Sequence, residues 1–179
     1  MLKTIVMPLA AALVLACEAA SAGDHPASPK IVHDQMFGVA RLYEYGVRCG
    51  AKPDQSRGLL ALRDTNLRFF SALDTLRALH RDATALQEAQ IRVDQLPRDL
   101  EGAAALADVT SGWKEGIAEA DAHETPIGKL CDTIFKALLQ GDAVAGSAAV
   151  DLQPRARDME QRMSELSRSL KAQRDASRR

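Results

Sequence analysis

The cysteines are the residues of this chain whose number and spacing point most directly to chemistry. The sequence holds three of them, Cys17, Cys49 and Cys131. Cys17 lies in the N-terminal stretch LVLACEAASAG, whose composition is that of a leader. The other two form an even pair, which in an exported protein predicts one structural disulfide. Because the sequence has no C-x-x-C and no histidine close to either residue, a redox or metal site is disfavoured.

The histidines and glutamates do not assemble into a familiar catalytic or metal-binding motif. His123-Glu124 begins the zinc-peptidase string H-E-x-x-H, but isoleucine stands at its last position. None of His33, His80 and His123 has the glutamate three residues earlier that a carboxylate-bridged di-iron bundle needs. C-x-x-C-H, G-x-S-x-G and the phosphate-binding loop motif are also missing. We therefore expect no cofactor, no metal and no catalytic residue, although a carboxylate pair of no fixed spacing stays open.

The N-terminus predicts export. Residues 1–22 contain Lys3, an apolar run and the small residues A-S-A, which is the three-part build of a signal peptide cleaved after Ala22. Cleavage before Cys17 with lipid attachment there is the alternative. No later stretch approaches the ~20 apolar residues of a membrane-spanning helix. We expect a periplasmic protein, with a lipid-anchored or a secreted protein as alternatives.

Composition narrows the class of protein further. A formal net charge of −1 gives no overall attraction to nucleic acid, and aromatic residues make up only 4% of the chain. The excess of alanine, and of arginine over lysine, is typical of bacterial genomes rich in G and C. The core must therefore be built mainly from leucine and alanine, which suits closely packed helices.

Apolar residues recur at steps of three and four along most of the chain, and strand-like alternation is absent. This pattern predicts an all-α bundle of four core helices plus a charged C-terminal helix. The expected helices run from Ser28-Pro29 to Cys49-Gly50, from Asp54 as far as Gln95, from Arg98 to about Ala120, and onward from Thr125-Pro126 with Ile127, Leu130 and Ile134 on its apolar side. The expected organisation is a disulfide-tied bundle over 23–139, a flexible loop of small residues over 140–150, and the C-terminal helix over 151–179.

Three positions in the bundle are candidate interface residues. Tyr45 and Arg48 lie in the last turns of the first helix, and Tyr45 is expected to be partly exposed because Tyr43 should point inward. Trp113 lies between Gly112 and Gly116, which favours either close helix packing or an accessible aromatic anchor. His80 and Asn66, on the apolar side of the second helix, are expected to be polar residues of the core.

The C-terminal segment is the strongest candidate for interaction. Met159, Met163, Leu166 and Leu170 follow heptad-like spacing over fewer than three heptads, a coiled-coil seam too short to be stable alone. We expect this helix to dock on its own bundle, on a second copy of the chain or on a partner. Its end is positively charged, without aromatic residues that would stack on nucleic acid.

These observations favour a non-catalytic binding protein of the bacterial envelope that holds a protein partner. Within that class, the leading hypothesis is an inhibitor or immunity-type protein that neutralises an enzyme acting on the cell wall. An assembly factor or chaperone of a secretion or pilus system is the first alternative. A cell-wall hydrolase without a recognisable motif is the second.

Overall fold

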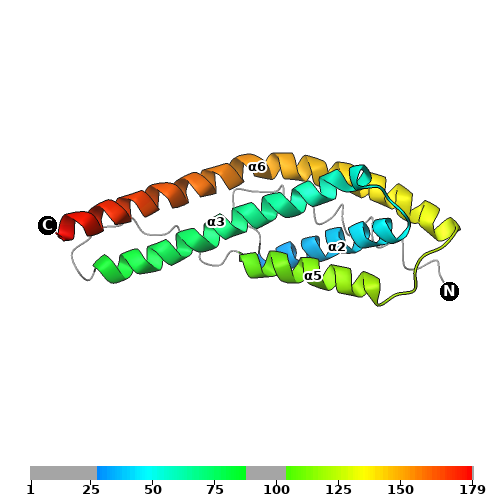
Figure 1. Cartoon of the computed structure of the whole chain (residues 1–179), viewed down its shortest axis with the longest axis horizontal. Helices are drawn as coiled ribbons and strands as arrows, with labels where there is room; N and C mark the ends of the chain where they lie inside the picture. Colours follow the sequence, from blue (N-terminus) through cyan, green and yellow to red (C-terminus); the bar gives the residue numbers. More distant parts are fainter. Residues whose placement is uncertain (1–27, 88–103, 179) are drawn as a thin grey trace.

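The protein folds as an elongated bundle of helices (Figure 1). Its structure, a computed structural model, describes residues 28–87 and 104–178. Within these residues the elements are α2 (Pro29–Arg48), the short 3-10 helix η1 (Pro53–Ser56), α3 (Arg57–Gln87), α5 (Leu106–Asp121) and α6 (Lys129–Ser177). The described part of the chain contains no strand, so the predicted all-α fold with one disulfide is confirmed.

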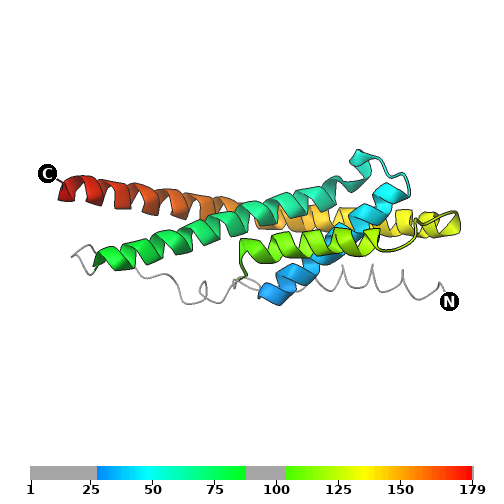
Figure 2. The same cartoon turned by 60° about the horizontal axis from the view of Figure 1, so that its bottom comes forward.

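The helices form two parallel pairs. α2 and α5 run in one direction, whereas α3 and α6 run in the other and continue beyond the first pair (Figures 1 and 2). α5 is fixed to α3 at its start, where the backbone N–H of Leu106 donates to the Asp74 carboxylate at 2.9 Å. Buried leucine, valine and methionine side chains from all four helices fill the core between them. Those with the least exposure are Met36, Val39, Leu42, Leu59, Leu62, Leu73, Val109 and Leu138.

Glycines allow the helices of each pair to approach closely. A Cβ atom at Gly112 or Gly116 of α5 would collide with backbone carbonyl oxygens of α2, and a Cβ at Gly58 of α3 would collide with the backbone of α6 at Asp142. The aliphatic core therefore includes backbone-to-backbone contact between helices. At these positions the presence of glycine follows from packing.

The first helix begins and ends as its sequence predicts. α2 follows Ser28 and has proline at its first position. Beyond its end, Gly50 has a φ of 86°, a left-handed conformation that glycine adopts without a steric penalty. Both boundaries can be inferred from local sequence because local backbone chemistry fixes them.

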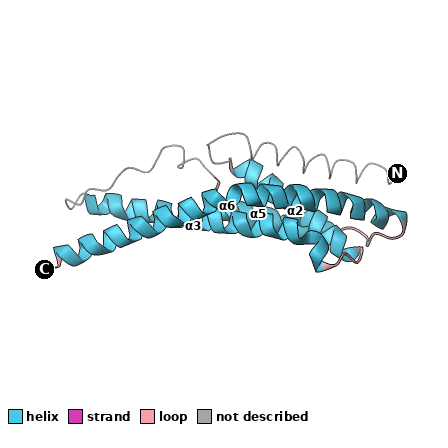
Figure 3. Cartoon of the chain, turned by 90° about the horizontal axis from the view of Figure 1, so that it is seen from above, coloured by secondary structure: helices cyan, strands magenta, loops and turns pink. Residues whose placement is uncertain are grey.

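The predicted loop over 140–150 is wrong, because this stretch lies inside α6, which is continuous from Lys129 to Ser177. The small residues that suggested a loop lie where α6 meets α3. Asp142 also accepts a hydrogen bond from the backbone N–H of Leu59 at 3.0 Å, which satisfies a donor in the first turn of α3. Tertiary packing therefore overrides a weak local helix propensity. The predicted fourth helix and C-terminal helix are one element, and Figure 3 shows it uninterrupted.

Other predicted boundaries differ in smaller ways. The last helix begins at Lys129 instead of Thr125-Pro126, after Gly128, whose φ is 54°. The signal peptide over 1–22, Cys17, and the stretches 88–95 and 98–103 that were assigned to helix ends all lie outside the described residues. Among the described helices, none combines the length and the apolar character that crossing a bilayer requires.

Candidate interaction site

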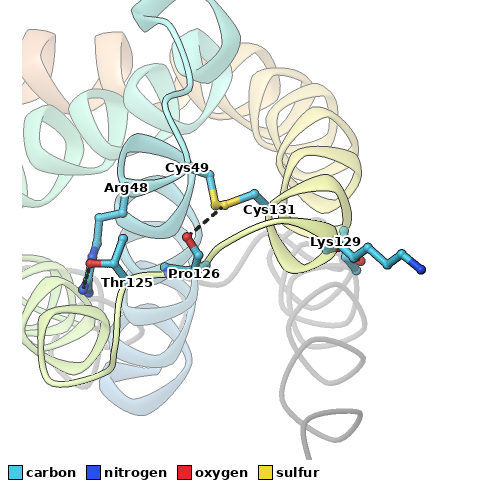
Figure 4. The surroundings of a disulfide bond; sticks show 7 residues. Arg48, Cys49, Thr125, Pro126, Lys129 and Cys131 are labelled. Carbon is cyan, nitrogen blue, oxygen red and sulfur yellow. Dashed lines mark hydrogen bonds between the residues drawn. A yellow bond between two sulfur atoms is a disulfide. The ribbon is translucent and has the colours of Figure 1, made fainter.

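The disulfide joins the end of α2 to the start of α6. Cys49 follows the last residue of α2 and Cys131 lies in the first turn of α6, with Cα atoms 5.4 Å apart and a sequence separation of 82 (Figure 4). The predicted pairing is confirmed. Because the bond connects helices from the two different pairs, it holds the start of α6, where the α5–α6 connection ends, beside the end of α2.

Arg48 holds that connection from the other side. Its guanidinium donates to the carbonyl oxygen of Ala120, to that of His123 at 2.8 Å, and to the hydroxyl oxygen of Thr125 at 3.1 Å. Carbonyl groups at a helix C-terminus lack partners within the helix and attract positive charge, so Arg48 acts as a cap supplied by α2 to α5. These hydrogen bonds engage part of the Arg48 guanidinium within the chain, and the interface role predicted for Arg48 stays a prediction.

The segment between α5 and α6, residues 122–128, is joined to the bundle near both of its ends. Pro126 is buried, and its carbonyl oxygen lies 3.3 Å from the sulfur of Cys131, a close contact in which the disulfide sulfur has no proton to donate. At the far end of the segment, the N–H of Cys131 donates to the carbonyl oxygen of Gly128 at 2.9 Å. We name residues 122–128 the tethered loop, because Arg48 and the disulfide hold it at its two ends.

Ile127 is the residue that the tethered loop presents to solvent. Its side chain is 80% exposed, the largest exposure among the described bulky apolar residues that lie on the surface. The loop residues His123, Glu124 and Thr125 are also exposed. This exposure differs from the prediction, which placed Ile127 on the apolar side of a helix that in fact begins two residues later. The local sequence T-P-I-G did contain a signal for this exposure, because the proline and the glycine on either side of Ile127 both interrupt helices.

Tyr45 does not have the exposure that was predicted for it. Only 6% of the residue is exposed, because Ala120 of α5 and Ile134 of α6 cover it in a small cluster at this end of the bundle. Burial raises the pKa of the Tyr45 hydroxyl above its usual value of 10.0, so it stays protonated at neutral pH. Tyr45 thus helps to hold the tethered end together and is not an exposed anchor.

Trp113 is half-buried and links three helices. Its ring centroid lies 5.7 Å from that of Tyr43 on α2, and the guanidinium carbon of Arg63 on α3 lies 4.8 Å from it on the ring face. The neighbouring Gly112 and Gly116 contact α2, so close helix packing explains these glycines. The Trp113 side chain keeps an exposed part, and its predicted interface role stays a prediction.

The C-terminal residues singled out by their spacing pack within the chain. Met159 and Leu170 are buried, while Met163 and Leu166 are half-buried beside the same core. Alongside them, Arg68 of α3 and Glu160 of α6 form a two-pronged ion pair with N···O distances of 3.0 and 2.8 Å. Of the three dockings left open, the structure shows docking on α3, which leaves little of Met159 and Leu170 for a partner.

Ionisable side chains do not gather into a metal site in the two described segments. Across 28–87 and 104–178, no group of three or more histidine, cysteine, aspartate or glutamate side chains is placed to hold an ion. His33 contacts two carboxylates, with Nε2 3.1 Å from Glu115 and Nδ1 3.3 Å from Asp34, on the exposed edge between α2 and α5. The contact between His33 and Glu115 joins α2 to α5.

The fold and the tethered loop define the class of molecule as a disulfide-tied α-helical bundle whose α5–α6 loop presents Ile127 to solvent. No protein family, curated protein or solved structure matches this chain. Its function must therefore be argued from the site itself.

Proposed function

We propose that this chain is a non-catalytic, exported binding protein of the bacterial envelope, of the inhibitor or immunity type, that holds a protein partner through the tethered loop. The observation that carries the proposal is the exposure of Ile127 on a backbone held by Arg48 and by the Cys49–Cys131 bond. The predicted leader and the disulfide favour an oxidising compartment outside the cytoplasm.

Preorganisation explains why such a loop suits tight binding. Ordering a flexible loop during association costs free energy, and a loop already fixed in the unbound protein avoids most of that cost. Transferring an exposed isoleucine side chain fully into an apolar pocket is worth about 1.5–3 kcal/mol. A tethered Ile127 can therefore act as an anchor residue whose burial contributes to affinity with little loss to ordering.

The chemistry of the loop indicates what a partner must offer. Asp121 and Glu124 are exposed on either side of His123, which is paired with Glu119 at 3.1 Å. The matching surface is a concave apolar pocket with basic groups at its rim, because charge complementarity speeds association and excludes wrong partners. An enzyme that acts on the cell wall offers a concave active-site cleft, and the proposed partner is one whose cleft also carries this apolar pocket and basic rim.

The test begins with capture of the exported protein after mild crosslinking, with mass spectrometry of bound proteins and of the chain's own N-terminus. The proposal expects one dominant partner, a stoichiometric complex in vitro, and loss of that partner's activity. Ile127→Asp should weaken the complex at least tenfold, whereas Ile31→Asp, at another exposed apolar position on α2, should leave affinity unchanged.

The other outcomes identify the alternatives. Suppression of aggregation of several unrelated clients would favour an envelope chaperone, and capture of a secretion component would favour an assembly factor. Release of fragments from peptidoglycan by the purified chain would indicate a hydrolase and overturn the non-catalytic assignment. Equal affinity of the Ile127→Asp variant would remove the tethered loop from the binding site.

A further inference from the structure

The Cys49–Cys131 bond places a reducible group directly beside the tethered loop. Both cysteines are half-buried, so the bond is not sealed inside the core. The carbonyl oxygen of Pro126 lies 3.3 Å from the sulfur of Cys131, and Figure 4 shows the loop passing beside the bond. A chemical change at this bond therefore acts on the loop that presents Ile127.

The stretch that follows the loop's first residues has few other attachments to the bundle. Pro126 is the one buried residue of the stretch 126–133, and its other residues are exposed or half-buried. The hydrogen bonds from Arg48 reach acceptors that lie before this stretch, at Thr125 and earlier. The disulfide is the covalent attachment of this stretch to α2.

The later part of α6 is held by contacts that do not involve the disulfide. Leu138, Ala145 and Met159 are buried in the main core. Asp142 accepts a hydrogen bond from the backbone N–H of Leu59. Because segments with few buried apolar contacts open at the lowest free energy, breaking the bond should release 126–133 before the rest of the bundle opens.

From this arrangement we infer that the Cys49–Cys131 bond is a redox switch of the tethered loop, opened by a dithiol reductant and closed by a disulfide oxidant. The inference rests on the proposed function, because it concerns the affinity of the same site. The intact bond keeps the backbone around Ile127 ordered before association. The reduced chain must order it during association, which costs free energy, so the oxidised chain is the binding form.

The switching reaction transfers two electrons from the dithiol to the disulfide. One thiolate of the dithiol attacks one sulfur of the bond, the S–S bond breaks, and the other cysteine leaves as a thiolate. The second thiolate of the dithiol then attacks its own sulfur in this mixed disulfide and displaces the first cysteine. The reductant leaves as a disulfide, and Cys49 and Cys131 each take up a proton to become thiols.

Hydrogen exchange and circular dichroism of the exported chain, with and without dithiothreitol, test the switch in the absence of a partner. The expected results are reduction without denaturant, about tenfold or more faster exchange over 126–133, and a retained helical signal. The matched control is the Cys49→Ala/Cys131→Ala double variant, which should exchange like the reduced chain and not respond to dithiothreitol.

Three results of that experiment would overturn the switch. One is a bond that dithiothreitol reduces only after denaturant is added. Another is exchange over 126–133 that does not change on reduction. The third is loss of the whole helical signal, on reduction or in the double variant, because the bond would then hold the fold and not the loop.

Affinity for the captured partner separates this inference from the proposed function. The oxidised chain should bind about tenfold or more tightly than the reduced chain, and dithiothreitol should not change the affinity of the double variant. Equal affinity of the oxidised and reduced wild type would overturn the switch and leave the site in place. Equal affinity of oxidised Ile127→Asp and oxidised wild type would overturn the proposed function, and the regulatory role with it, whatever the exchange shows.

Discussion

The two ends of the bundle are built differently. At the tethered end, four helices meet and the Cys49–Cys131 bond and the Arg48 hydrogen bonds connect elements distant in sequence. At the opposite end, Figure 1 shows only α3 and α6 continuing among the described residues, and few side chains are buried between them, among them Ala83 and Leu170. One end has covalent and backbone-to-backbone contacts, and the other depends on side-chain burial.

This difference predicts unequal local stability. Segments with few buried apolar contacts open locally at a lower free energy than cross-linked, densely packed segments. Native-state hydrogen exchange should therefore be faster over 163–177 than over 129–140, although both belong to the single helix α6. An anchor residue contributes more to affinity when its backbone is already ordered, and Ile127 lies at the end of the bundle that the disulfide holds.

The disulfide has the largest expected effect on this contrast. Replacing both Cys49 and Cys131 by alanine releases a closed loop of about 80 residues and should lower the free energy of unfolding by about 4.5 kcal/mol. Denaturant titration of the variant against the oxidised wild type measures it. A loss below about 1 kcal/mol would mean that the tethered end is held mainly by noncovalent packing.

Leu170→Ala probes the two-helix end. Removing a buried leucine side chain there should cost about 2–4 kcal/mol, in the lower range for buried leucine because two helices can move together to close the space. Exchange of amide protons should increase over 163–177 and change little near Cys131. Equal acceleration at both ends would show that the bundle unfolds as one unit and would remove the proposed contrast.

Gly112→Ala tests the backbone contact between α2 and α5. The new Cβ would collide with the carbonyl oxygen of His33, so the helices must move apart, at a cost of about 1–3 kcal/mol. Gly146→Ala is the matched control in α6, where the nearest atom, the Cα of Gly58, would lie at an ordinary 3.5 Å. That control should be neutral or more stable by up to about 1 kcal/mol, because alanine favours helix. Similar destabilisation by both substitutions would contradict the packing explanation.

Arg48→Met removes the cap of α5 while keeping an apolar chain. We expect a loss of about 1–2 kcal/mol in unfolding free energy, because the carbonyl groups of Ala120 and His123 lose a charged donor. Arg48→Lys should recover part of it, since an ammonium reaches fewer acceptors. If Arg48→Met also weakens the captured complex as much as Ile127→Asp does, the rigidity of the loop contributes directly to binding.

The smallest expected effect concerns the ion pair between Arg68 of α3 and Glu160 of α6, which lies partway between the two ends of the bundle. The hydrogen bonds from Arg68 hold the pKa of Glu160 below its usual value of 4.5. A lowered folded-state pKa contributes stability above the unfolded pKa, and the contribution disappears as the pH falls through the folded pKa. NMR titration should show an upward shift of the Glu160 pKa in Arg68→Gln, with Asp34, held low by Lys30, unchanged. No shift would mean that solvent screens the pair.

Much of the fold could be predicted, but less of the candidate site. The boundaries of α2 follow from its capping residues and from the glycine at its end, which are local signals. The disulfide follows from the number of cysteines, because two cysteines outside the leader allow one pairing. The burial of Tyr45 could not be inferred, because α5 and α6 cover it. The exposure of Ile127 could not be inferred either, because it depends on the residue at which α6 begins. Arg48 and the disulfide, which are distant in sequence, influence that starting point.

The sequence by itself determined helix periodicity, the first helix and the cysteine pair, because these depend on neighbouring residues and on composition. Tertiary structure decided that residues 140–150 continue a helix, because the two glycines, Asp142 and Ser147 of this stretch lower its local helix propensity, whereas Asp142 and Gly146 fit a close approach to α3. It also decided which apolar residues stay uncovered. Periodicity shows that a helix has an apolar side, but only the packing of the other helices determines which of its apolar residues remain in water.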